Sequence, residues 1–258
     1  MTNPEISIIM PSIRPTELKG FYESVLKSTK RTFELILATP FNLPDEIKNL
    51  SNVVSIKTFA SPIVASQMAV PLCRGKLIFW TSDDSLLIED SLDKNIDLLY
   101  SMGDDHKNVV VAKYYEGKNR TEKLLQPDSY FKINGSTWTS SQYVSDDYWI
   151  FNVAIMHRSF FEELGGWSTE YQACPYAYCD LAIRAQKESA RVIMSDYPLL
   201  DCDWGQPGHE PIEIAQIHDD YPIYQRKFRT EAYNTLQTKI DINNWKNCPP
   251  VWDKRFRQ

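Results

Sequence analysis

The chain has 258 residues, of which 43% are hydrophobic and 24% are charged, as in an ordinary soluble globular protein. This length suffices for one large α/β domain or for two small ones. Because the net charge is −6, we expect no nucleic-acid partner, since nucleic-acid-binding proteins normally carry a basic balance. No apolar run approaches the length of a membrane span and residues 1–5 are polar, so we expect neither a transmembrane segment nor a signal peptide.

The cysteines are odd in number and scattered, without the spacing of a zinc motif. Such a set is typical of free thiols in a reducing compartment, and we therefore expect a cytoplasmic protein without disulfide bonds. The five are Cys73, Cys174, Cys179, Cys202 and Cys248.

The first 102 residues switch regularly between strand-like and helix-like patterns. Apolar runs predict strands at residues 6–9, 33–38, 53–56 and 76–80. Apolar residues at helical spacing predict helices over residues 18–26, 64–72 and 92–99, with Gly75 as a C-cap of the second. Strands that alternate with helices predict a largely parallel sheet flanked by helices.

The stretch 74–86, RGKLIFWTSDDSL, joins a buried strand to a polar loop with two adjacent carboxylates, Asp83 and Asp84. In an open α/β sheet, ligands bind beyond the carboxyl ends of the strands. Two carboxylates at that place suit a hard divalent cation, which brings phosphate oxygens with it. The alternative is a polar turn in which Asp84 or Ser85 caps the next element.

The order strand, Pro-rich loop, helix, strand, helix, followed by LCRGKLIFWTSDDS, resembles the family 2 glycosyltransferases of the GT-A fold. The resemblance implies an α/β fold with a Rossmann-like, mixed but mostly parallel sheet flanked by helices. It also implies that Asp83 is the main ligand of Mn²⁺ or Mg²⁺ against the diphosphate of a nucleotide sugar, with Asp84 beside it. The sequence departs from the family at Thr81, where the first aspartate of the acidic motif usually stands.

Two further segments of the first half match the family's nucleotide pocket. Pro11, Ser12 and Arg14 correspond to the first loop, which lines the base pocket. Thr39 stands at the end of the second strand, where the family commonly has an aspartate that reads the base and ribose. These residues and Asp84 are the expected donor-binding set.

The middle of the chain gives weaker signals. Residues 109–112 predict a strand, and residues 116–148 are polar and aromatic with little periodicity. Lys118, Arg120 and Lys123 lie close together there, where they can meet phosphate or serve as ordinary surface charges. A long irregular segment inside a compact domain is usually a lid or a binding loop.

The second half carries LGGWSTEYQACPYAYCDLAIR between predicted strands at residues 149–156 and 191–194. It resembles the family's Gly-Gly-aromatic turn followed by a DLALR-like helix, which Asp180 and Arg184 match. The family's base is usually the aspartate of a Glu-Asp pair at positions that hold Ala177 and Tyr178 here. Asp180 is therefore the candidate catalytic base. The alternative is a carboxylate that stabilises the start of the helix.

Two histidines follow in an acidic segment, His209 and His218. Some members of the family use a late histidine as a further metal ligand, and imidazole suits manganese. We favour His218 as the ligand because Asp219 and Asp220 follow it directly. A surface or capping histidine is the alternative for both.

The resemblance covers residues 6–228 and implies one GT-A domain over residues 1–258. A nucleotide-sugar half (1–102) would precede an acceptor half (103–240) and a C-terminal tail (241–258). The implied activity is metal-dependent, inverting transfer of a sugar from a nucleotide sugar, foremost a UDP-sugar, to a hydroxyl of a glycan or another acceptor. The aromatic and basic tail permits weak contact with an acidic membrane surface.

Two other interpretations remain open. A GT-A-fold protein that binds nucleotide sugars or glycans without catalysis would explain why Thr39, Thr81 and Tyr178 replace expected carboxylates. A nucleotidyltransferase of related shape is disfavoured, because the chain has only nine glycines and no Gly-rich phosphate loop.

Overall fold

The computed structural model describes residues 3–118, 124–125, 132–133, 148–203 and 205–256. Within them the strands are β1 (Ile6–Pro11), β2 (Phe33–Thr39), β3 (Val53–Lys57), β4 (Leu77–Trp80), β5 (Ser85–Leu87), β6 (Asn108–Gly117), β7 (Leu124–Leu125), β8 (Lys132–Ile133), β9 (Tyr148–Trp149), β10 (Ala154–His157) and β11 (Arg191–Asp203). The larger sheet has the order β3-β2-β1-β4-β10-β6-β11-β5, with β7 beside β6, and β8 pairs with β9 separately.

The larger sheet is mixed. Strands β1 to β4 run parallel to one another, and so do β6 and β11. Strand β10 is antiparallel to both of its neighbours, β4 and β6. Strand β4 is a continuous apolar run and β1 and β2 are mostly apolar, because both faces of the sheet are covered there. The predicted α/β class and the four predicted strands of the first half are confirmed.

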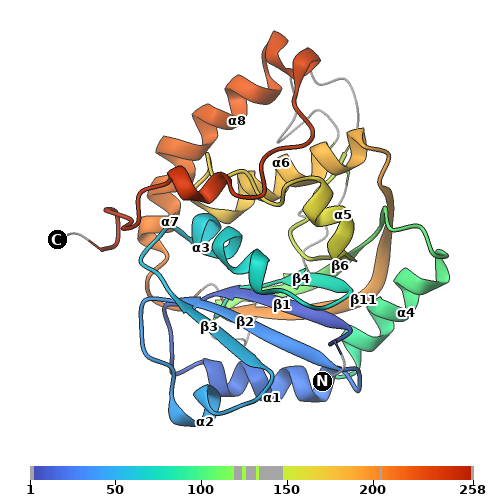
Figure 1. The fold of residues 1–258 in the computed structure, drawn as a ribbon, viewed down its shortest axis with the longest axis vertical. Coiled ribbons are helices and arrows are strands. Elements are labelled where there is room, and N and C mark those ends of the chain that lie inside the picture. Colours follow the sequence, from blue (N-terminus) through green and yellow to red (C-terminus); the bar gives the residue numbers. More distant parts are fainter. Residues whose placement is uncertain (1–2, 119–123, 126–131, 134–147, 204, 257–258) are drawn as a thin grey trace.

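Helices cover both faces of the sheet (Figure 1). Helices α1, α2 and α4 lie on one side, and α3, α5, α6 and α8 lie on the other. The bounds are α1 (Leu18–Ser28), α2 (Asp45–Lys48), α3 (Pro62–Ala69), α4 (Ser91–Ser101), α5 (Arg158–Glu163), α6 (Cys174–Lys187), α7 (Glu210–Ala215) and α8 (Tyr221–Phe228). Shorter helical segments are η1 (Val70–Leu72), η3 (Gln216–Asp220), η4 (Glu231–Thr235) and η5 (Asn244–Asn247).

The strands of the second half differ from their predictions in extent. The run predicted over residues 149–156 divides into β9 and β10, because residues 150–153 belong to no strand. Strand β11 continues well past residue 194 to Asp203, with a shift of register against β6 between Ser195 and Leu200. The part of β11 after residue 195 lacks the sequence pattern of a buried strand. It is nevertheless extended because residues 200–203 pair with β6 and residues 200–202 pair with β5. Most of the irregular segment 116–148, with Arg120 and Lys123, lies outside the described residues.

The buried carboxylate of Glu34 holds Arg74 and Gly75, the residues that lead into β4. It accepts hydrogen bonds from the Ser7 hydroxyl (2.6 Å), from Arg74 Nε (2.9 Å) and from the Gly75 amide (3.2 Å). A Cβ on Gly75 would lie 2.5 Å from the Ser7 backbone nitrogen. The prediction of Gly75 as a helix C-cap is therefore wrong: the glycine is needed because two backbones pass too close for any side chain.

The expectation of unpaired cysteines is confirmed. All five cysteines are free. Among the helices in the described part of the chain, none combines the length and the apolar character that crossing a membrane requires.

The close approach at Gly75 predicts the effect of an added methyl group. Gly75→Ala should lower the free energy of unfolding by about 2 kcal/mol or more, because backbone atoms of β1 must shift. The matched control is Gly20→Ala in α1, where nothing lies within 4 Å of the new Cβ and helix propensity should add up to about 1 kcal/mol. Urea unfolding followed by tryptophan fluorescence measures both free energies. Equal effects of the two substitutions would contradict the close backbone approach at Gly75.

Candidate active site

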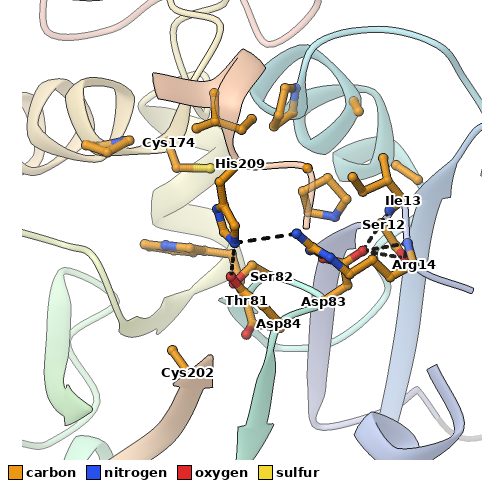
Figure 2. A pocket seen from close by; sticks show the side chains of 18 of the residues that line it. Ser12, Ile13, Arg14, Thr81, Ser82, Asp83, Asp84, Cys174, Cys202 and His209 are labelled. Carbon is orange, nitrogen blue, oxygen red and sulfur yellow. Dashed lines mark hydrogen bonds and ion pairs between the residues drawn. The ribbon is translucent and has the colours of Figure 1, made fainter. Parts of the chain in front are cut away.

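A cleft of about 310 Å³ opens at the carboxyl ends of the parallel strands β1 and β4. The loops after these strands form one wall, and the N-terminal part of α6 forms another. Residues of the segment 208–212 and of the C-terminal segment 252–256 also line it. Figure 2 shows Arg14, Asp83, Asp84 and His209, from three of these segments, close to one another. The position agrees with the rule that ligands of open α/β sheets bind beyond the carboxyl ends of the strands.

Asp83 joins the two loops of the first wall. Its Oδ2 accepts hydrogen bonds from Ser12 Oγ (3.0 Å) and from the backbone amides of Ile13 (2.7 Å) and Arg14 (2.8 Å). Its Oδ1 forms an ion pair with the Arg14 guanidinium. The carboxylate is buried, and both of its oxygens have protein donors (Figure 2). Asp83 thus fixes the loop that the sequence assigned to the donor.

Asp84 lies beside it and faces His209. The two side chains approach to 3.5 Å between His209 Nε2 and the Asp84 carboxylate, and Ser82 Oγ also donates to that carboxylate. Burial raises the pKa of Asp84, the neighbouring charge of Asp83 adds to this effect, and the Ser82 hydrogen bond opposes it. Asp83 and Asp84 do lie in a turn, as the alternative interpretation predicted, but neither Asp84 nor Ser85 caps a helix, because strand β5 follows.

Positive charge enters the cleft from both ends of the chain. Arg14 Nε and Nη2 donate to the Pro207 carbonyl (3.1 and 2.6 Å), so this arginine bridges the β1 loop and the segment before α7. Arg255 donates to the Gly208 carbonyl and lines the same cleft. Burial lowers the pKa of Arg255, and the nearby positive charge of Arg14 lowers it further.

Arg255 arrives through the C-terminal segment, which docks against the loop between β3 and α3. The Trp252 amide donates to the Phe59 carbonyl (2.8 Å), and Trp252 Nε1 donates to the Gln172 side chain (2.6 Å). The sequence shows basic and aromatic residues in the tail, but the pattern alone could not reveal that Arg255 reaches the cleft. Its placement depends on a contact with Phe59, nearly two hundred residues earlier.

The sheet supplies the floor of the cleft. Tyr114 and Glu116 of β6 pair in register with Leu200 and Cys202 of β11, and all four line the cleft. They share a face because successive side chains of a strand alternate between the two faces. Burial raises the pKa of Glu116, and the charge of Asp84 acts in the same direction. Glu116 was not among the predicted site residues, because the strand was predicted over residues 109–112 only, whereas β6 continues to Gly117.

The N-terminal part of α6 brings Cys174 and Tyr178 to the cleft. Tyr178 also packs against Trp80 and Trp167, with ring centroids 5.8 and 6.3 Å away. Burial raises the pKa of the Tyr178 phenol well above its usual value, so the side chain stays neutral. The position that the resemblance assigns to a catalytic carboxylate is thus in the cleft, but a neutral tyrosine occupies it.

Asp180 lies outside the cleft lining. It is fully buried, and it forms ion pairs with Arg184 (2.6 Å) and Lys227 (3.0 Å). Burial opposes its ionisation, but the two cations outweigh burial and lower the pKa of the carboxyl. A helix turns by about 100° per residue, so positions 178 and 180 point in nearly opposite directions. The carboxylate predicted as the base is therefore not presented to the cleft.

The ion pair of Asp180 orients Arg184 toward the Gly-Gly turn. Arg184 donates to the carbonyls of Leu164 (2.8 Å) and Gly166 (2.6 Å). Gly165 and Gly166 both adopt positive φ, which side chains rarely tolerate. The Gly-Gly turn and the helix motif with Asp180 and Arg184 thus bind one another, and they stabilise the fold around α6.

His218 and Thr39 also lie outside the cleft lining. His218 is exposed on η3, where Asp219 pairs with Lys254 (2.9 Å). The Asp220 carboxylate accepts from the amides of Gln172 (2.8 Å) and Ala173 (2.7 Å), just before α6. Both acidic neighbours that favoured His218 are thus engaged elsewhere, and His209 is the histidine that reaches the cleft. Thr39 lines a separate hollow between β2 and β3.

The described residues do not fit the predicted metal site. In the part of the chain that the structure describes, no group of three His, Cys, Asp or Glu side chains is arranged to hold a metal ion. Asp83, the predicted main ligand, already binds a guanidinium and three further donors. These residues as arranged do not form a ligand set for Mn²⁺ or Mg²⁺, which prefer several oxygen ligands.

The fold is a GT-A-like glycosyltransferase fold. It is similar to that of S. aureus TarS, with a TM-score of 0.55 and 14% identity over 77% of this chain and 36% of that chain. A structure of S. aureus TarS 1-349 in complex with UDP-GlcNAc gives a TM-score of 0.52 and 14% identity over 80% of this chain and 60% of that chain. The chain therefore spans less than two thirds of these proteins. No protein-family model and no curated protein matches the sequence.

The buried pair of Asp180 predicts a large loss of stability. Asp180→Ala should lower the free energy of unfolding by about 3 kcal/mol or more, because it leaves the buried Arg184 without its carboxylate. Glu170→Ala is the matched control: Glu170 pairs with the same Lys227 at 2.7 Å but is exposed, so the loss should stay below about 1 kcal/mol. Urea unfolding measures both, and a small effect of Asp180→Ala would contradict the structural role.

Asp220 predicts a specific pH dependence of stability. Burial raises its pKa to about 6, although the two backbone hydrogen bonds oppose the shift. A carboxyl with a raised pKa binds its proton more tightly when folded, so its contribution to the free energy of unfolding falls as pH rises from about 4 to 6. Relative to Asp220→Asn, the wild type should lose about 1–2 kcal/mol between pH 4.5 and 7. Urea unfolding at several pH values tests this, and a constant difference would refute it.

Proposed function

We propose that this protein is a glycosyltransferase that uses a nucleotide-sugar donor, with a UDP-sugar as the first candidate. The observation that carries the proposal is the cleft at the carboxyl ends of β1 and β4, where Arg14, Arg255 and His209 meet Asp83 and Asp84. Guanidinium groups suit the diphosphate of such a donor. The likeness in fold to a protein solved with UDP-GlcNAc supports the same donor class.

Transfer to a hydroxyl requires a base that takes the acceptor proton as the oxygen attacks. Glu116 lines the cleft, and burial raises its pKa toward the range that suits a general base. Asp180 is held in ion pairs away from the cleft. We therefore assign the base to Glu116. Direct in-line attack on the donor sugar would invert its anomeric centre, as the resemblance to family 2 implies.

Binding and turnover test the proposal separately. Titration calorimetry with UDP and UDP-GlcNAc measures donor binding. Release of UDP from a panel of UDP-sugars, with and without added glycan acceptors, measures transfer or hydrolysis. Donor binding with release of UDP supports the proposal. Absence of binding to every nucleotide and nucleotide sugar tried would refute it.

The role of Glu116 predicts a loss of rate without a loss of fold. Glu116→Gln keeps the shape of the side chain but cannot accept a proton, so turnover should fall by roughly 10²-fold or more while donor affinity changes little. Lys113→Gln, on the other face of the same strand, is the matched control and should keep normal turnover. Steady-state rates of UDP release measure both. Normal turnover in Glu116→Gln would remove it from the mechanism.

A second candidate function is binding of nucleotide sugars or glycans without catalysis. The specific observation in its favour is Tyr178, a neutral side chain at the cleft position where the family places its base. This candidate predicts donor binding with no release of UDP for any sugar or acceptor tested. The same pair of measurements therefore distinguishes the two functions.

A further inference from the structure

The strongest unexplained feature of the cleft is the ion pair between Arg14 and Asp83. We infer that guanidinium groups of the chain, with Arg255 foremost, bind the diphosphate of the donor, and that binding does not require a divalent cation. This inference rests on the proposed function, because it concerns how the donor of that reaction is held.

The first argument is the engagement of Asp83. Three neutral donors at 2.7 to 3.0 Å occupy its Oδ2, and the Arg14 guanidinium occupies its Oδ1. A cation that took these oxygens would have to break these bonds and leave the largely buried Arg14 without its carboxylate. Removing one partner of a buried ion pair is strongly unfavourable. The arginine thus takes the place that the sequence assigned to the metal.

The second argument is that Arg14 is held from several sides. Besides Asp83, it donates twice to the Pro207 carbonyl and lies 3.4 Å from His209 Nε2. Only 12% of its side chain is exposed. Such a group is preorganised and cannot readily turn away to vacate a metal site. It also holds residues 207–209 against the β1 loop, and so it shapes the cleft around the expected position of the diphosphate.

The third argument is the charge that Arg255 adds. Asp83 balances Arg14, whereas Arg255 is anchored by a backbone carbonyl, that of Gly208, and stacks near Trp252 with 5.3 Å between the guanidinium carbon and the ring centroid. Both guanidinium groups line the cleft, and the charge of Arg14 lowers the pKa of Arg255, so an anion beside them is favoured. A planar guanidinium can bind phosphate through two hydrogen bonds, so it can supply the charge compensation that a metal ion supplies elsewhere.

The experiment compares UDP binding with and without a cation. Wild-type protein is titrated with UDP in EDTA, and again in Mn²⁺ and in Mg²⁺, by calorimetry. We expect affinities within about threefold of one another, which is under 1 kcal/mol. Saturable UDP binding that requires Mn²⁺ or Mg²⁺ would overturn the inference and leave the proposed function standing. No binding of UDP under any condition would overturn both.

Variants assign the effect to Arg255. In EDTA, Arg255→Gln should weaken UDP binding by roughly 10-fold or more, because a charge-assisted hydrogen bond is lost. Arg255→Lys keeps the charge and should lose less. Lys254→Gln is the matched control, since Lys254 is the adjacent cation but pairs with Asp219 and does not line the cleft. Circular dichroism confirms folding of each variant. Equal affinity in Arg255→Gln and Lys254→Gln would overturn the assignment.

Discussion

The carboxylate of Asp83 is the interaction on which the cleft depends. It lies at the end of a buried strand and receives donors from three consecutive residues of the loop after β1. Through Arg14, the same carboxylate reaches the segment before α7, and through that segment the C-terminal residues around Arg255. A single buried charge therefore positions chain segments from the beginning, the middle and the end of the sequence.

A second buried charge organises the other half in the same way. Asp180 holds Arg184, and Arg184 binds carbonyls of the Gly-Gly turn. The order of Gly165, Gly166, Asp180 and Arg184 in the sequence is thus explained by packing, since each is needed where it stands for the turn and α6 to meet. A resemblance between motifs locates such residues correctly, but it does not separate those that hold the fold from those that face a substrate.

Much of the fold follows from local patterns. The strands of the first half were predictable because buried parallel strands are continuous apolar runs, as in LIFW of β4. The placement of Pro11, Ser12, Arg14, Asp83 and Asp84 in one cleft was also predictable, because the carboxyl ends of parallel strands meet at one edge of the sheet. The division of residues 149–156 and the length of β11 were not, because they depend on partner strands.

The sequence by itself determined the α/β class, the edge of the sheet where the cleft lies, and the acidic pair at its centre. Periodicity and the chemistry of short motifs are local properties, so they can be read without the fold. Only the tertiary structure decided that Asp180 is paired away from the cleft, that His209 and not His218 reaches it, and that Glu116 and Arg255 join it. These outcomes depend on the direction of side chains and on contacts between distant segments, and neither is encoded in any one stretch of the chain.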